Sequence, residues 1–204
     1  MRHPDFKAPG KPLKLTARNS TMTGLFFSTL TPFVEPTEAE IDRALSILGM
    51  SRGQCVCAYC GDKKSEWDHF RPIISGRAPT GYITEIANLV PSCGKCNQSK
   101  SGSYWKDWIL GNAPNSPKSR GIRDLKKRIA RLETFESWKI PRRIAYEKVA
   151  SRKQWAKHRD FLERVLRLLA DAEKHARELR SLFAQTLVAE RTRPNKSQER
   201  ARGR

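Results

Sequence analysis

Two short cysteine motifs, Cys57-Ala-Tyr-Cys60 and Cys93-Gly-Lys-Cys96, decide the fold of this 204-residue chain. In a Cys-x-x-Cys motif both sulfurs can point at one centre, so two such motifs can supply four thiolates to one tetrahedral zinc ion. The 32 residues between the motifs, Gly61 to Ser92, are long enough to form a β-hairpin. Four thiolates leave no open position for water, and the sequence therefore predicts a structural zinc site that stabilises a small core.

The cysteine content also bears on the compartment. Cys55 lies two residues before the first motif and is one thiol more than a tetrahedral site needs, so we expect it to be a spectator. Paired cysteines in a chain rich in Lys and Arg favour metal ligation in a reducing compartment over disulfides. The N-terminus lacks the apolar run of a signal peptide, and the apolar stretch from Leu25 to Val34 is short and interrupted. We expect a cytoplasmic protein, bacterial or phage-encoded, without a membrane span.

The net charge is strongly positive and unevenly distributed. The chain carries 40 Lys and Arg against 21 Asp and Glu, a formal charge of +19. Residues 105–204 hold 27 of the basic and 12 of the acidic residues, so that half alone carries +15. Such an excess is typical of a protein that binds a polyanion, with nucleic acid as the first candidate. Charge alone leaves a solvated basic surface or an anionic membrane as alternatives.

Composition and periodicity divide the chain into four regions. Residues 1–53 are predicted to form a basic arm and a buttressing helix, whose start is marked by the capping box Thr37-Glu-Ala-Glu40. Residues 54–110 contain the cysteine motifs and the pattern of short strands followed by a helix. Residues 111–192 are predicted to be basic and helical, and residues 193–204 to be a disordered basic tail. We therefore expect an α+β protein whose C-terminal half is predominantly helical.

The longest helix is predicted to begin near Ser151-Arg-Lys-Gln154, a second capping-box pattern, and to run until Pro194. Its apolar seam consists of Phe161, Val165, Leu168, Ala172, Leu179 and Leu182 or Phe183. Such a seam is most often a core or coiled-coil face, so homodimerisation and packing back on the core are its two expected uses.

Between and beside the cysteine motifs stands a second set of polar residues: Asp68-His69, Asn88 and Asn97. Together with the cysteines, in this order and spacing, they make the chain resemble the HNH endonuclease family. The resemblance covers about a quarter of the chain and implies a ββα-metal, treble-clef-like core, in which two strands and a helix hold one divalent cation and a catalytic imidazole. It implies an endonuclease that hydrolyses phosphodiester bonds.

The resemblance assigns roles to these residues. His69 is the expected general base, because a neutral imidazole can take a proton from water near neutral pH. Asp68 and Asn97 are the expected ligands of a catalytic Mg²⁺ or Mn²⁺, since these cations prefer oxygen donors. Asn88 is expected to bridge the hairpin loop and to orient the imidazole of His69.

Basic and aromatic residues flank the expected site. Arg71, Lys95 and Lys100 are candidates for contacts with nucleic-acid phosphates, with solvated surface charge as the alternative. Trp67, Tyr104, Trp105 and Trp108 could stack on bases, although the nearby apolar Ile109-Leu110 favours core packing for them.

Two classes of function remain open at this point. The first is a metal-dependent DNA endonuclease, either as a homodimer or beside a partner ATPase or methyltransferase. Restriction or other defence against phage is its preferred role, and homing and the processing of phage DNA are alternatives. The second is a non-catalytic zinc protein that binds nucleic acid through its basic half.

Overall fold

The computed structural model describes residues 10–192, and their side chains as far as Ala189. The helices and strands, in chain order, are η1 (Leu15–Arg18), α1 (Asn19–Ser28), α2 (Glu38–Ile47), β1 (Glu66–His69), β2 (Ile74–Ser75), β3 (Ala78–Pro79), η2 (Ile86–Asn88), β4 (Leu89–Ser92), α3 (Gly94–Lys100), α4 (Trp105–Ile109), α5 (Leu125–Trp138), α6 (Tyr146–Val149) and α7 (Arg152–Thr192). Across residues 10–192, no helix combines the length and the apolar composition needed to cross a bilayer.

The chain divides into two compact units. One is the segment 23–158, and the other joins residues 10–22 to residues 159–192. The first unit contains both cysteine motifs and all the polar residues predicted for the site. The sequence predicts a boundary at residue 111 between the cysteine-motif region and the basic helical region. In the structure, residues on both sides of position 111 belong to the same unit. The boundary therefore stays a prediction about the functions of the two regions.

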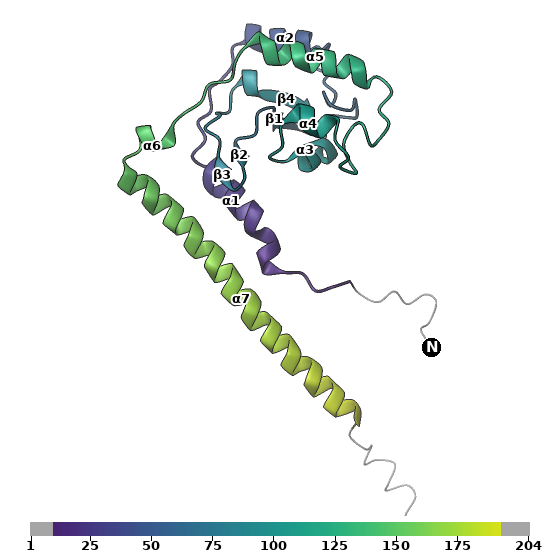
Figure 1. Cartoon of the computed structure of the whole chain (residues 1–204). Helices are drawn as coiled ribbons and strands as arrows, with labels where there is room; N and C mark the ends of the chain where they lie inside the picture. Colours follow the sequence, from purple (N-terminus) through teal and green to yellow (C-terminus); the bar gives the residue numbers. More distant parts are fainter. Residues whose placement is uncertain (1–9, 193–204) are drawn as a thin grey trace, which may run out of the picture. The chain divides into compact units, whose positions relative to one another are not determined.

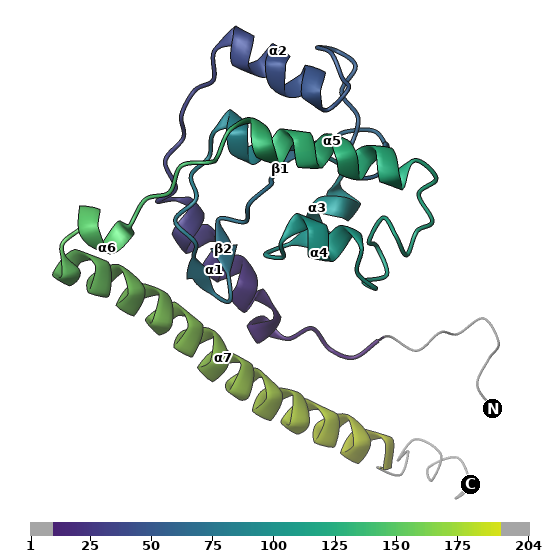
Figure 2. The ribbon, with the colours of Figure 1, turned by 45° about the horizontal axis from the view of Figure 1, so that its top comes forward.

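A hairpin of two four-residue antiparallel strands, joined by a long connection, forms the centre of the larger unit. Strand β1 pairs with β4, so that Asp68 lies opposite Val90 and His69 opposite Leu89. The small β2–β3 hairpin and the η2 turn lie within the connection between them. Helix α3 follows β4 at once, which confirms the predicted order of two strands and a helix and the α+β class. In Figures 1 and 2, helices α2 and α5 lie along one side of this hairpin, and α3 and α4 along the other.

Helix α2 begins where its capping box predicts. The side chain of Thr37 accepts a hydrogen bond from the backbone N–H of Glu40, and the Glu40 carboxylate accepts one from the N–H of Thr37. After the helix, Gly49 takes a φ of 71°, a left-handed conformation that favours glycine and ends the helix. Ala44, Leu45 and Leu48 are buried on its inner face.

Aromatic side chains fill the core beside the hairpin. Phe70 stacks on Trp105 with ring centroids 5.2 Å apart and meets Phe135 of α5 edge to face at 5.4 Å. Tyr59 packs edge to face on Trp108 at 5.1 Å. Trp105 and Trp108 are therefore core residues, as the apolar neighbourhood predicted. The four cysteines of the two Cys-x-x-Cys motifs belong to this same buried cluster.

Helix α5 is fastened to the first cysteine motif by an arginine. The guanidinium of Arg128 donates to the backbone carbonyls of Cys57 (3.1 Å) and Ala58 (3.5 Å). It lies so close to Gly61 that a Cβ at that position would come within 2.4 Å of its Nη2. Glycine at position 61, with a φ of 83°, thus supplies both the turn and the space for Arg128.

The C-terminal helix begins where the sequence predicts and continues to Thr192, the last described residue. Helix α7 begins after Ser151, whose hydroxyl accepts from the N–H of Gln154 while the Gln154 side chain accepts from the N–H of Ser151. In the smaller unit, the backbone N–H of Leu15 donates to the carboxylate of Glu173 on this helix. Helix α1 was not predicted from the sequence. The predicted disordered tail, residues 193–204, lies outside the described residues.

Candidate active site and metal centre

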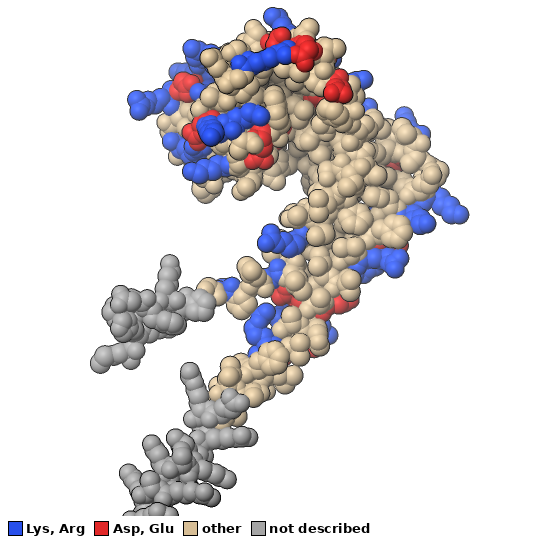
Figure 3. Space-filling view, turned by 180° about the vertical axis from the view of Figure 1, so that it is seen from behind, with Lys and Arg blue, Asp and Glu red and all other residues tan. Residues whose placement is uncertain are grey.

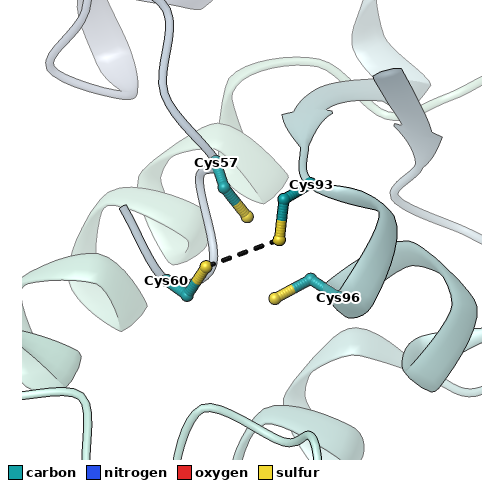
Figure 4. A group of neighbouring side chains, drawn as sticks. All are labelled: Cys57, Cys60, Cys93 and Cys96. Atoms are coloured by element: carbon teal, nitrogen blue, oxygen red, sulfur yellow. Dashed lines mark hydrogen bonds between the residues drawn. The ribbon is translucent and has the colours of Figure 1, made fainter. Parts of the chain in front are cut away.

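The four motif cysteines converge on one point. Cys57 and Cys60 come from the loop before β1, Cys93 follows β4, and Cys96 lies in α3 (Figure 4). Their sulfurs all lie within 4.8 Å of one another, and all four residues are buried. The Cys60 and Cys93 sulfurs are 3.6 Å apart, close to the separation of about 3.8 Å expected for two thiolates bound to one zinc ion. The cluster therefore has the donor set and the spacing that zinc requires.

The pKa values of these thiols depend on one another. Hydrogen bonds from the neighbouring thiols, first that of Cys60, lower the pKa of Cys57 to about 3. The interaction with Cys57 raises the pKa values of Cys60 and Cys96 above that of an ordinary thiol. In the absence of a cation, a thiolate at Cys57 thus favours the protonated thiols at Cys60 and Cys96. A divalent metal would remove that conflict by neutralising several thiolates at once. Cys55 lies outside the cluster, and its thiol contacts the carbonyl of Ser51 at 3.6 Å.

Strand β1 alternates its side chains between two faces. Glu66 and Asp68 point toward α3, where Glu66 meets Asn97 and Asp68 meets Lys100. Asn97 and Lys100 are three residues apart on α3, so the two contacts form successive rungs between the strand and the helix.

The Asp68 rung is fully buried. The Tyr59 hydroxyl donates to Oδ2 of Asp68 at 2.6 Å, and the Lys100 ammonium lies 3.0 Å from the same oxygen. Lys100 also donates to the backbone carbonyl of His69 at 2.9 Å. Burial raises the pKa of Asp68 and lowers that of Lys100, and the ion pair opposes both shifts. Each charge is thus tolerated in the core because the other is present.

The Glu66 rung is more accessible. The side-chain amide of Asn97 donates to Oε2 of Glu66 at 2.8 Å, and both residues are only partly buried. The pair thus contains a carboxylate and an amide, and the amide oxygen of Asn97 is not the atom that bonds Glu66. Oxygen donors of this kind suit Mg²⁺ or Mn²⁺ better than zinc.

His69 ends β1 with its side chain directed away from the Asp68 rung. Its Nε2 lies 2.8 Å from the hydroxyl of Thr84. Burial, reinforced by the positive charge of Lys100, lowers the pKa of His69 to about 4. The ring is therefore neutral at physiological pH, the form in which an imidazole can accept a proton.

Asn88 bridges the long loop of the hairpin. Its side-chain amide donates to the carbonyls of Arg71 and Ile83, both at 3.1 Å, and its oxygen accepts from the N–H of Arg71 at 2.7 Å. Asn88 is completely buried. These bonds match the predicted bridging of the loop, whereas the ring of His69 is contacted by Thr84.

Comparison with known proteins agrees with this geometry. A family model described as HNH endonuclease matches residues 57–103. Residues 57–103 form an HNH endonuclease domain. The HNH domain begins at the first zinc-motif cysteine and ends just beyond α3, so it contains both rungs and His69.

One curated relative supports the nuclease assignment. Over 96 residues the chain is 34% identical to the CRISPR-associated endonuclease Cas9 of Corynebacterium diphtheriae. The match covers 45% of this chain and 8% of that protein, so the chain spans only a small part of its relative's length. No solved structure matches the chain.

The basic residues predicted to contact phosphates differ in their surroundings within the HNH domain. Lys95 is exposed. Arg71 forms an ion pair with Glu136 and lies over the ring of Tyr104 at 4.7 Å. Lys100 has no exposed surface, because its ammonium is committed to Asp68 and to the chain at His69. The surface role expected for Lys100 is therefore replaced by an internal one.

Tyr59, Glu66 and Thr84 contact the predicted site residues, although the sequence assigned none of the three a role. Glu66 precedes the Asp68-His69 pair by two residues, so the period of a strand could have placed it on the face of Asp68. Thr84 lies 15 residues from His69, and no periodicity connects the two positions.

Proposed function

We propose that the chain is a metal-dependent DNA endonuclease that hydrolyses phosphodiester bonds. The observation that carries the proposal is the position of a neutral, partly buried His69 at the end of β1. The same short strand presents Glu66 and Asp68 to α3 of a matched HNH domain. A base and oxygen donors for a cation on one rigid element are what phosphodiester hydrolysis requires.

His69 is proposed to act as the general base. A proton on its ring is disfavoured by burial and by Lys100, so the imidazole stays available to accept a proton from water. Asn88 supports this task from a distance by fixing the loop that returns from β1 to β4.

Asn97 and Asp68 are proposed to hold the catalytic cation, with Glu66 as an additional carboxylate beside Asn97. Their oxygens fit Mg²⁺ or Mn²⁺. When bound, the cation supplies positive charge that polarises the scissile phosphate and stabilises the leaving oxygen. Lys100 holds the Asp68 carboxylate, so the share of Asp68 in such a site depends on the ion pair between them.

DNA is the proposed substrate, and restriction or other defence against phage is the proposed biological role. The basic half supplies attraction for a polyanion. Figure 3 shows Lys and Arg side chains outnumbering acidic ones on the face displayed, spread over its surface. Residues 111–192 are proposed to bind DNA, to dimerise, or to dock on a partner ATPase or methyltransferase.

Nicking of supercoiled plasmid in Mg²⁺ or Mn²⁺ tests the proposal. Wild-type protein should cleave, and His69→Ala should lose at least about a hundredfold in rate, the usual contribution of a general base. Cys55→Ser is the control, since Cys55 lies outside the cysteine cluster and has no place in the proposed site, and it should cleave like wild type. Equal cleavage by wild type and His69→Ala would refute the proposed role of His69.

The basic half also supports a second candidate, a zinc protein that binds nucleic acid without cleaving it. Residues 105–204 carry +15, enough for a binding constant that falls steeply with salt. Tight, salt-dependent binding without cleavage in any divalent metal would favour this second function over the first.

A further inference from the structure

The ring of His69 is held by Thr84, a residue with no assigned role. The hydroxyl of Thr84 lies 2.8 Å from Nε2 of His69, a full-strength hydrogen bond between partly buried groups. Thr84 lies in the loop between the two strands, so the contact joins the end of β1 to the middle of the connection.

The backbone of Thr84 is fixed from both sides. Its N–H donates to the carbonyl of Pro32 at 3.0 Å, and its carbonyl accepts from the N–H of Val34 at 2.9 Å. Phe33 and Thr84 thereby form a parallel β-bridge. The segment that leads from α1 to α2 therefore pairs, through a single β-bridge, with the loop that carries Thr84.

The residues on either side of Thr84 are fixed as well. Ile83 is buried, and its carbonyl accepts from the side chain of Asn88 at 3.1 Å. Glu85 is buried and accepts from the backbone N–H and the guanidinium of Arg142, at distances of 2.6 to 2.9 Å. Three consecutive residues are therefore tied to three different parts of the unit. A hydroxyl on such a backbone has little freedom to move away from the imidazole.

We propose that Thr84 is a positioning residue that fixes the orientation and the tautomer of His69. The inference rests on the proposed nuclease function. A base needs one ring nitrogen with a free lone pair, and the hydroxyl of Thr84 occupies Nε2. In the proposed tautomer, Nε2 carries the hydrogen and donates it to Oγ1 of Thr84, and Nδ1 is the proton acceptor.

The proton balance of the step is simple. Nδ1 takes a proton from water while the water oxygen bonds to phosphorus, and the bond from phosphorus to the leaving 3′ oxygen breaks. That oxygen takes a proton from solvent, and the imidazolium later returns its own proton to solvent. The Nε2–H bond to Thr84 stays intact throughout, and it becomes stronger while the ring is positively charged.

Three variants test the role of the hydroxyl. Thr84→Val removes the hydroxyl at nearly constant shape, and Thr84→Ser keeps it. Thr80→Val is the matched control, because the Thr80 hydroxyl lies in the same loop but bonds the carbonyl of Pro72 at 2.6 Å. We expect Thr84→Val to lower kcat by about tenfold to a hundredfold with little change in KM for DNA, whereas Thr84→Ser and Thr80→Val stay near wild type.

Nitrogen-15 NMR of histidine-labelled protein provides a readout that does not depend on cleavage. Wild type and Thr84→Ser should show His69 as the single Nε2–H tautomer, and Thr84→Val should show a mixture of tautomers. An Nδ1–H tautomer in wild type, or a Thr84→Val protein with unchanged tautomer and kcat, would overturn the assignment. A wild-type protein that shows the Nε2–H tautomer but cleaves no DNA would instead refute the nuclease function.

Discussion

At the scale of single residues, the ion pair between Lys100 and Asp68 has the largest expected effect on stability. Lys100→Met leaves the buried carboxylate without its counter-charge and should lower the free energy of unfolding by about 3–5 kcal/mol. Urea unfolding of the zinc-loaded protein measures this loss. Lys106→Met is the matched control, because its pair with Glu133 is about half exposed and screened by solvent, so its loss should change stability far less than the loss of Lys100. Equal losses would contradict the structural role of Lys100.

His69 provides a prediction about pH. Its pKa of about 4 lies below the ordinary value of 6.5, so between these values the unfolded chain binds the proton more readily than the folded one. The contribution of His69 to stability is therefore complete above about pH 6.5 and is lost as the pH falls toward 4. Comparing unfolding free energies of wild type and His69→Asn from pH 7 to pH 4 isolates this slope. A His69 NMR titration midpoint near 6.5 would contradict the burial of the ring.

At the scale of elements, the four-cysteine cluster connects the hairpin to α3, and we expect zinc to occupy it. The ligands of one ion lie before β1, after β4 and within α3, so removal of zinc should release all three elements together. We expect chelation to cause a cooperative loss of near-ultraviolet circular dichroism and of plasmid cleavage. Cys96→Ser should bind less zinc, and Cys55→Ser should retain the wild-type stoichiometry. Full cleavage after complete zinc loss would contradict the coupling.

The same scale shows what could be predicted from the sequence. The capping boxes at Thr37 and Ser151 and the two cysteine motifs depend on neighbours a few residues away, and the structure confirms each of them. The contact between Thr84 and the segment 32–34, and that between Thr84 and His69, depend on tertiary packing of distant segments. No local pattern encodes them. The burial of Lys100 was missed for the same reason, since its partner lies 32 residues away.

At the scale of the whole molecule, the exposed apolar side chains of α7 predict self-association. Leu168, Leu182, Phe183 and Leu187 are each more than half exposed on this helix. Exposed apolar side chains at helical spacing are typical of a face that pairs with another helix. We therefore expect a homodimer by sedimentation equilibrium, and a monomer for the double variant Phe183→Glu and Leu187→Glu. Arg180→Glu is the control for added negative charge on the same part of the helix. A monomeric wild type would refute the prediction.

The arginine that joins α5 to the first cysteine motif predicts a dependence of the protein's lifetime on metal content. Arg128 donates to the backbone carbonyls of Cys57 and Ala58, in the loop that carries two of the four clustered cysteines. If loss of a metal ion opens that loop, α5 should lose this anchor and expose the buried side chains of Leu132 and Phe135. Proteases cleave such opened segments in proportion to their population. We therefore expect metal-depleted protein to be cleaved by proteases faster than metal-loaded protein.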